Sequence, residues 1–395
     1  MKKPKVAIVR IKNGDFLSAV KEAIELAGGL PDKIEKDILI KPNILTFKKT
    51  EEETIPIITN PEVVRSIIKI VKEKDYKSKI YVADSSGSGL DTSKVIEKTG
   101  FSKLEEEGVT VCQISSNGST EVEPKNPLKL KKTTFSNLSL NSVIINVPKM
   151  KTHTLTRVTL AIKNLFGTIP GMEKSRIHAV GNTAKGFSKC LVDIYSILKD
   201  KIVMNVMDAS IAMEGHGPSH GSPVKMDLIL ASKDAVALDA VATSIMDEKP
   251  SRVFTTRIAS ENSYGVSNLD DIEIVGEKID DVKHKFKMPE KFISFLPIGI
   301  FFELNKKQPE YKGSGCIACL RCQKICPVQA IVVDKKEKRP YFDYTKCISC
   351  FSCNEICPEG VITITRRKYK KQLLFGGFIG LAFIALILVV SILLA

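Results

Sequence analysis

The most constraining feature of this sequence is a cysteine pattern that occurs twice near its carboxyl-terminal end. Eight of the ten cysteines lie within residues 316–357, and each half of this segment has the spacing C-x2-C-x2-C-x3-C-P. Three thiolates spaced by three residues on a tight loop can face three corners of a cubane cluster. The fourth cysteine begins a short helix that leads away from them, so it reaches a second cluster.

This spacing predicts two [4Fe–4S] clusters with crossed ligands. We expect the first cluster to be held by Cys316, Cys319, Cys322 and Cys357. We expect the second to be held by Cys347, Cys350, Cys353 and Cys326. A disulfide framework requires an oxidising compartment, and no signal peptide is recognisable at the amino terminus. Zinc knuckles use C-x2-C pairs rather than tandem triplets, so zinc is the weaker alternative.

An apolar stretch follows each Cys-Pro pair, AIVVD at 330–334 and VITIT at 361–365. We expect these stretches to form small sheets that cover the clusters. By these stretches and the two cysteine patterns, residues 311–365 resemble the bacterial dicluster ferredoxins. The resemblance implies a domain that carries single electrons.

The larger amino-terminal part, residues 1–285, alternates segments of strand and helix character. Continuous apolar runs predict strands at 6–11, 37–43, 79–84, 142–148, 201–209 and 226–234. Amphipathic or capped segments predict helices at 18–29, 60–74, 92–100 and 235–246. Strands that are apolar throughout are typically buried on both faces. The expected fold is therefore α/β, with a largely parallel sheet covered by helices.

Polar and basic segments follow several of these predicted strands, which is where ligands bind in parallel α/β sheets. Lysine side chains supply charge there, and the N–H groups of a glycine-rich loop such as DSSGSG at 84–89 can bind an anion. The candidate residues for an anionic substrate or cofactor are Lys41, Asn43, Asp84, Ser85, Ser86, Lys149, Lys151, His153, Lys163 and Asn164. An ordinary glycine-rich turn and solvated lysines are the alternatives.

A further polar segment is a candidate for a metal site. Asp208, Glu214, His216 and His220 lie within 13 residues, and their side chains are ligands for divalent ions. The same residue types also occur in glycine-rich turns that have only a structural role.

Several of these segments occur together in one known family. The motifs are IKPN, TNPEVV, VADSSGSG, INVPKMKTH, AIKNLFGTIPG, DASIAMEGHGP and ASKDAVALDA, in this order. By them, residues 5–250 resemble the family known as domain of unknown function 362. Its members often carry a dicluster ferredoxin segment, so the resemblance implies an iron–sulfur protein and names no substrate.

The last 23 residues, 373–395, contain no charged side chain. As a helix they would extend about 34 Å, which is enough to cross a bilayer core of about 30 Å. The preceding segment, 366–372, holds five basic residues, and these are expected to stay in the cytoplasm. We therefore expect a single transmembrane helix, with the bulk of the chain on the cytoplasmic side of the cell membrane. Residues 286–310 are expected to be a linker.

These features favour a membrane-anchored iron–sulfur electron-transfer protein. Its ferredoxin module would pass electrons to or from an α/β domain that binds an anionic substrate or cofactor, as in an iron–sulfur oxidoreductase. The alternative is a non-catalytic electron-relay or scaffold subunit of a membrane-associated redox complex. Both need a redox partner protein. The net charge of +14 is compatible with nucleic acid, but the densest basic run adjoins the predicted membrane helix, so nucleic-acid binding is not expected.

Overall fold

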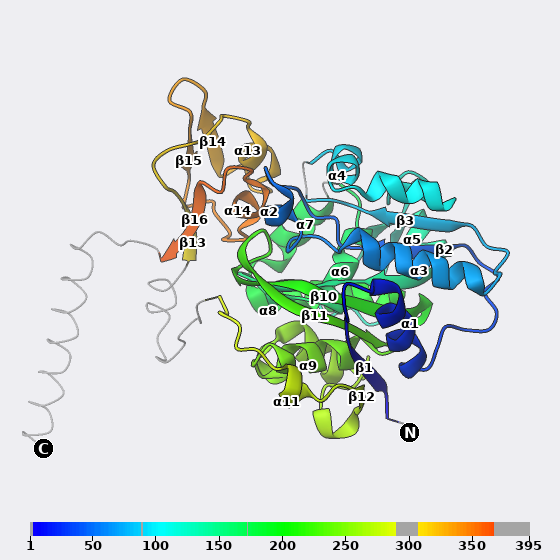
Figure 1. The fold of residues 1–395 in the computed structure, drawn as a ribbon. Helices are drawn as coiled ribbons and strands as arrows, with labels where there is room; N and C mark the ends of the chain where they lie inside the picture. Colours follow the sequence, from blue (N-terminus) through cyan, green and yellow to red (C-terminus); the bar gives the residue numbers. More distant parts are fainter. Residues whose placement is uncertain (1–2, 88–89, 172, 290–306, 367–395) are drawn as a thin grey trace, which may run out of the picture.

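The computed structural model of the protein describes residues 3–87, 90–171, 173–289 and 307–366. Its largest element is a sheet of ten strands with the main order β12-β1-β11-β10-β7-β2-β3-β4, to which β8 and β9 are added beside β10 (Figure 1). These strands are β1 (Lys5–Arg10), β2 (Ile38–Pro42), β3 (Ile80–Asp84), β4 (Thr110–Gln113), β7 (Val143–Val147), β8 (Lys149–His153), β9 (Arg157–Thr159), β10 (Ile202–His216), β11 (His220–Ser232) and β12 (Glu273–Gly276). A separate antiparallel pair is formed by β5 (Ser119–Val122) and β6 (Thr133–Ser136).

The sheet is largely parallel and buried on both faces, as the apolar runs predict. The neighbours β4, β3, β2, β7 and β10 run parallel, and only β11 lies antiparallel to its neighbours on the main path, β1 and β10. Successive residues of β2 face opposite sides. Ile38 and Ile40 belong to one hydrophobic core, Leu39 belongs to the other, and all three are fully buried. This alternation explains why the strand has no polar face.

Helices cover both faces of the sheet (Figure 1). Buried residues of α1 and α3 pack into one core, and those of α8, α9 and α10 pack into the other. Helix α3 begins where the sequence predicts, because the Asn60 side chain accepts a hydrogen bond from the Glu62 N–H and Pro61 occupies the first turn. The α-helices of this domain are α1 (Phe16–Leu26), α2 (Glu51–Thr54), α3 (Pro61–Glu73), α4 (Thr92–Lys98), α5 (Asn137–Asn141), α6 (Ala161–Asn164), α7 (Glu173–Gly181), α8 (Ala184–Leu198), α9 (Ala235–Ile245), α10 (Phe254–Glu261) and α11 (Ile279–Val282). The 3₁₀ turns are η1 (Phe101–Glu107), η2 (Leu165–Thr168), η3 (Lys199–Lys201), η4 (Pro250–Arg252) and η5 (Leu269–Asp271).

One predicted region differs in its local structure. Segments 201–209 and 226–234 were expected as two separate strands joined through a glycine-rich segment. The structure instead joins β10 and β11 in one long antiparallel hairpin, paired from Asn205↔Ser232 to His216↔His220. Only three residues connect the two strands, which is too short for a parallel crossover. Most of the segment that was a candidate metal loop is therefore strand.

A second, smaller unit contains the eight clustered cysteines. Its elements are β13 (Lys307–Tyr311), α13 (Arg321–Ile325), β14 (Ile331–Asp334), β15 (Arg339–Phe342), α14 (Ser352–Ile356) and β16 (Ile362–Arg366). Strand β13 pairs with β16, and β14 pairs with β15, both antiparallel. Each short helix follows a residue in the left-handed conformation, Leu320 or Phe351, each with φ of 63°. The sequence repeat is therefore also a repeat of backbone conformation. We call residues 307–366 the cysteine module.

The predicted transmembrane helix, 373–395, lies outside the described residues, as does most of the predicted linker. Within the parts of the chain that the structure describes, no helix has the length and apolar character needed to cross a membrane. The chain still packs against the large domain beyond residue 285. The Lys287 N–H donates to Glu214 Oε2, and the Lys287 carbonyl accepts from the Gly215 N–H.

Candidate functional site

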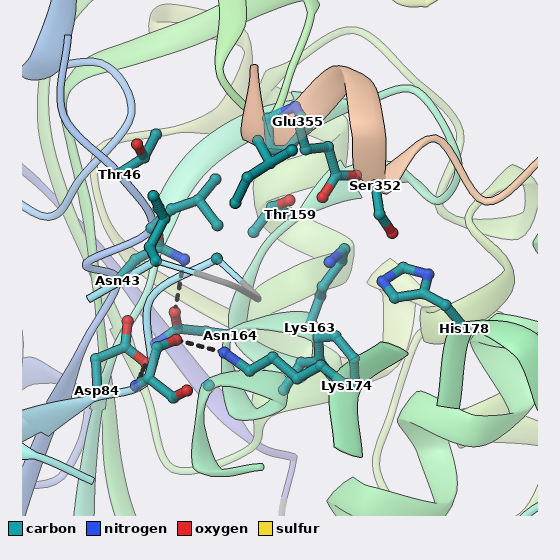
Figure 2. A pocket seen from close by; sticks show the side chains of 18 of the residues that line it. Asn43, Thr46, Asp84, Thr159, Lys163, Asn164, Lys174, His178, Ser352 and Glu355 are labelled. Carbon is teal, nitrogen blue, oxygen red and sulfur yellow. Dashed lines mark hydrogen bonds between the residues drawn. The ribbon is translucent and has the colours of Figure 1, made fainter. Parts of the chain in front are cut away.

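A cavity of about 70 Å³ lies between the cysteine module and the carboxyl-terminal ends of β2 and β3 (Figure 2). This volume admits about five to seven water-sized positions. The large domain contributes residues between Asn43 and His178, together with Pro218 from the β10–β11 turn, and the module contributes Ile325, Ser352, Glu355 and Ile356. The lining residues from the large domain include Asn43, Thr46, Asp84, Ser85, Lys151, Thr159, Lys163, Asn164, Phe166, Lys174 and His178. Six of the ten predicted site residues therefore line one cavity.

Polar residues at the strand ends form a fixed network at one side of the cavity. Lys41 Nζ lies 2.7 Å from Asp84 Oδ1, and both side chains are buried. Asp84 Oδ2 also accepts from the Ile44 N–H at 2.6 Å. Burial lowers the pKa of Lys41, and Asp84 opposes this shift. A Cβ atom at residue 167 would collide with both charged groups, which explains the glycine at that position. Lys41 is thus a paired structural cation, and it does not line the cavity.

Two asparagines connect neighbouring strand ends within this network. The Asn164 amide donates to the Lys41 carbonyl at 3.1 Å and to Asn146 Oδ1 at 2.8 Å, and its oxygen accepts from Asn43 Nδ2 at 3.0 Å. Lys151 Nζ donates to Asn43 Oδ1 at 2.9 Å and to the carbonyl of Ile57 at 2.6 Å. Burial, with the charges of neighbouring lysines, lowers the pKa of Lys151 well below its usual range. These contacts hold the wall of the cavity rigidly.

Basic groups with few partners form the opposite wall. Lys163 has no hydrogen bond or ion pair among the described residues, and its ammonium lies 5.4 Å from the Phe166 ring centre. The His178 ring stacks on Phe187 at 4.1 Å, and its Nδ1 has no partner. Lys174 Nζ donates to the carbonyls of Ser85 and Ser86. Burial lowers the pKa of Lys174 to about 7 and that of His178 to about 3. Burial thus disfavours the charged forms of both groups, and a bound anion would favour them again.

The cysteine module contributes an acidic side chain to this cavity. It is Glu355, on α14, and it faces the basic groups just described. Its Oε1 lies 3.3 Å from His153 Nε2, with a geometry that does not make a hydrogen bond. Burial would raise the pKa of Glu355, but His153, Lys163 and His178 outweigh it and lower the pKa to about 2. Burial and Lys163 lower the pKa of His153 to about 4. Figure 2 shows Glu355, Ser352, Lys163 and His178 facing one another across the cavity.

The other predicted site residues lie outside this cavity. Lys149 Nζ pairs with Asp208 Oδ2 at 2.8 Å, and both side chains are fully buried. Burial lowers the pKa of Lys149, and Asp208 opposes the shift. Ser86 is buried, and its hydroxyl donates to the carbonyl of Ile44 at 2.8 Å. His153 does not line the cavity, but its Nε2 faces Glu355, which does. Sequence reasoning did not single out Lys174 or Glu355. Lys174 lies on α7, a helix that the sequence analysis did not predict, and Glu355 lies inside a cysteine motif.

The four residues of the possible metal segment do not come together. Asp208 is committed to Lys149 and to the Ser210 N–H at 2.9 Å. Glu214 accepts from the Lys287 N–H, and His220 Nε2 lies 3.0 Å from Lys48 Nζ. Over residues 3–87, 90–171, 173–289 and 307–366, no three His, Cys, Asp or Glu side chains are arranged to hold a single metal ion.

The cysteines of the module surround two cavities of about 20 Å³ each. Cys316, Cys319, Cys322 and Cys357 line one of them. Cys326, Cys347, Cys350 and Cys353 line the other. None forms a disulfide. Burial raises the pKa of Cys322 to about 12 and that of Cys350 to about 11, so these thiols need a cation to become thiolates. Four sulfur donors around each space fit a four-iron cage, which holds its ligands farther apart than one ion does.

Comparisons with known proteins agree with these two units. The family described as Domain of unknown function (DUF362) matches residues 38–244, more than half of the chain. A 4Fe–4S dicluster domain matches residues 315–371. The Thylakoid-associated protein sll1697 of Synechocystis sp. is 30% identical over 260 residues, which are 64% of this chain and 76% of that protein. The chain belongs to the DUF362 family, and its 4Fe–4S domain gives it an iron–sulfur electron-transfer role.

Proposed function

We propose that the protein is a membrane-attached iron–sulfur oxidoreductase that exchanges electrons with a small anion bound in the cavity. The observation that carries the proposal is the shared wall of the cavity: Lys163 and His178 come from the large domain, and Ser352 and Glu355 come from the module. Glu355 lies between two cysteines of the second motif in sequence. A ligand held here would be adjacent to both units, which favours electron exchange between them.

The proposal includes two [4Fe–4S] clusters with crossed ligands. One would be held by Cys316, Cys319, Cys322 and Cys357, and the other by Cys347, Cys350, Cys353 and Cys326. The two cysteine-lined cavities support this assignment, because each contains three cysteines of one motif and the last cysteine of the other. One-electron transfer is the chemistry that such clusters supply. The protein residues bind the anion, exclude bulk water and fix the position of the ligand against α14.

Membrane attachment is supported by the sequence and by the relative. Residues 373–395 carry no charge and follow a basic run, and the relative's name describes it as thylakoid-associated. Deletion of residues 373–395 should move the protein from the membrane fraction to the supernatant with its iron content unchanged. A deleted form that stays with the membrane after alkaline carbonate washing would contradict this anchor.

The redox proposal can be tested on the full chain, purified anaerobically in detergent. Small molecules released by denaturation would be identified by mass spectrometry and returned both to the oxidised protein and to protein reduced with dithionite. An anion that donates electrons should bleach the visible absorption of the oxidised clusters, an anion that accepts electrons should restore it in the reduced protein, and Lys163→Met should slow either change. Lys324→Met is the control substitution. Lys324 lies on α13, which is the counterpart of α14 in the first cysteine motif, and its side chain is exposed.

A relay subunit without catalysis is the second candidate, and Glu355 favours it. This carboxylate already faces the basic groups of the cavity, so an internal anion offsets part of their charge. In that case cluster reoxidation would follow a partner protein and would not respond to any small anion.

A further inference from the structure

Four polar atoms around the cavity make no hydrogen bond. Three of them, Thr159 Oγ1, His178 Nδ1 and Glu355 Oε1, are buried, and Glu355 Oε1 has only the close contact with His153 Nε2 at 3.3 Å. Lys163 makes no hydrogen bond or ion pair with any described residue. All four side chains line the same cavity. Buried polar groups are nearly always satisfied, so a cluster of unsatisfied ones indicates that a ligand or ordered water completes them.

The chemistry of these atoms restricts the ligand. The Lys163 ammonium can only donate hydrogen bonds, whereas an ionised Glu355 carboxylate can only accept them. A ligand that satisfies both must therefore present an acceptor at one end and a donor at the other. Thr159 and His178 can adapt to either, because a hydroxyl and a neutral imidazole each donate and accept. A simple oxoanion without a hydrogen atom would leave Glu355 unsatisfied and would be repelled by it.

The surrounding charges restrict the donor further. Lys163 lines the cavity without an ion pair to another described residue, and a ligand ammonium would add a second positive group beside it. A neutral hydroxyl satisfies Glu355 without this penalty. The volume of about 70 Å³ has room for a small ligand.

We infer that this cavity binds a small hydroxycarboxylate, whose carboxylate accepts from Lys163 and whose hydroxyl donates to Glu355. The inference rests on the proposed function and names the chemical class of its ligand. Glu355 then has a specificity role: it belongs to the cysteine module, yet it distinguishes a hydroxy acid from the acid that lacks the hydroxyl. The module thereby recognises the ligand as well as closing the cavity.

The test is a pair of probes that differ only in the hydroxyl, glycolate and acetate. Binding would be measured by calorimetry on the full, cluster-loaded chain in detergent, under anaerobic conditions and at neutral pH. We expect glycolate to bind at least about tenfold more tightly than acetate, because a hydrogen bond to a buried charged group is lost with acetate. Glycine serves as the probe with an ammonium in place of the hydroxyl, and it should bind more weakly than glycolate.

Two variants separate the roles of the residues. Glu355→Ala should remove the preference for glycolate, and acetate should bind more tightly once the competing carboxylate is gone. Lys163→Met should weaken both probes together. Glu355→Gln keeps the size of the side chain if the alanine variant loses its clusters, and it should reduce the preference without removing acetate binding. Iron content and the visible spectrum of each variant verify folding, and Lys324→Met should leave every value unchanged.

The possible failures are distinguishable. Equal affinity for glycolate and acetate, or tighter binding of glycine, overturns the hydroxycarboxylate inference and leaves an anion site in place. Absence of binding by both acids in protein with full iron content overturns the inference together with the proposed anion site, and ordered water then satisfies the four polar atoms. A preference for glycolate that survives Glu355→Ala overturns the role of Glu355.

Discussion

The two cysteine motifs of the module have the same spacing and different surroundings. Ile325 and Ile356 occupy equivalent positions, 31 residues apart, and both line the central cavity. The residues that precede them differ: Lys324 is exposed, whereas Glu355 faces the basic groups of the large domain. Cys319 of the first motif is exposed, whereas its equivalent Cys350 is only partly exposed. The second motif also places the Cys357 carbonyl 3.3 Å from His220 Nε2 of the large domain.

This difference shows what the repeat determines and what it leaves free. The cysteines, the left-handed residues before α13 and α14, and the two isoleucines repeat because both motifs must build the same loop and helix. The positions between the cysteines carry no such requirement. In the second motif Ser352 and Glu355 line the cavity shared with the large domain, whereas in the first motif Gln323 and Lys324 are exposed. The half of the module that holds the second motif thus provides most of the contact with the large domain, and we call it the interface half.

The largest expected effect comes from exchanging a cysteine that crosses between the two motifs. Cys326→Ser should lower the iron content from about eight to about four per chain, because one of the two clusters loses a ligand. The cluster lost should be the one held mainly by the second motif, since Cys326 shares its cavity with Cys347 and Cys350. Electron paramagnetic resonance of the reduced protein would identify the remaining cluster by comparison with Cys347→Ser. Matching spectra are expected, and a match to Cys316→Ser instead would contradict the crossed assignment.

Charge reversal at the two equivalent positions should have unequal effects. Glu355→Lys places a cation beside Lys163 and removes the counter-charge of that lysine. We expect this variant to lose about 3–5 kcal/mol of stability, as when a buried ion pair is left with like charges. Lys324→Glu changes an exposed residue and should alter stability by no more than about 0.5 kcal/mol. Denaturant unfolding of both variants measures the difference, and similar losses would mean that the two halves are equally exposed.

The strand-end residues were predictable from the sequence for a clear physical reason. The carboxyl ends of parallel strands meet at one edge, so Asn43, after β2, and Asp84, at the end of β3, were expected near one another. The Asn43–Lys151 hydrogen bond and the contacts of Asn164 join these loops. Which lysine faces the cavity was not predictable. Lys149 is withdrawn because the pairing of β8 with β10 sets it opposite Asp208.

Two features of the site depend on contacts between residues that are far apart in the sequence, so no local sequence pattern predicts them. Glu355 acquires its role only when the module docks, because its partners His153 and Lys163 belong to a distant part of the chain. The β10–β11 hairpin also brings Ser219 to the module, where its hydroxyl donates to the Glu355 carbonyl at 3.1 Å. From the sequence, residues 208–220 were a possible metal-binding loop. The residue types are visible in the sequence, whereas the pairing of β10 with β11 that makes most of this segment strand is not.

The pH dependence of anion binding should follow the titration of Lys174, which belongs to the large domain and not to the module. Burial lowers the pKa of Lys174 to about 7, so this lysine loses its proton as pH rises through 7. Acetate or glycolate should therefore bind more weakly at pH 8 than at pH 6, by up to about tenfold per unit of pH for a single proton. Lys174→Met should remove this dependence. The sign for stability is opposite: the folded state binds fewer protons than the unfolded state between pH 7 and about 10.5, so stability rises with pH there.

The smallest expected effect tests a contact at the rim of the interface half. Lys49 Nζ lies 2.9 Å from Glu359 Oε2, and the lysine side chain is 76% exposed. The position equivalent to Glu359 in the first motif is Val328, which has no charge to offer. Exposed ion pairs are weakened by water and by salt, so this pair should add little to docking. Lys49→Ala should leave the unfolding midpoint within measurement error at physiological salt, and any decrease should disappear at high salt. A large, salt-resistant loss would show that the rim, rather than Glu355 and its bases, holds the module against the large domain.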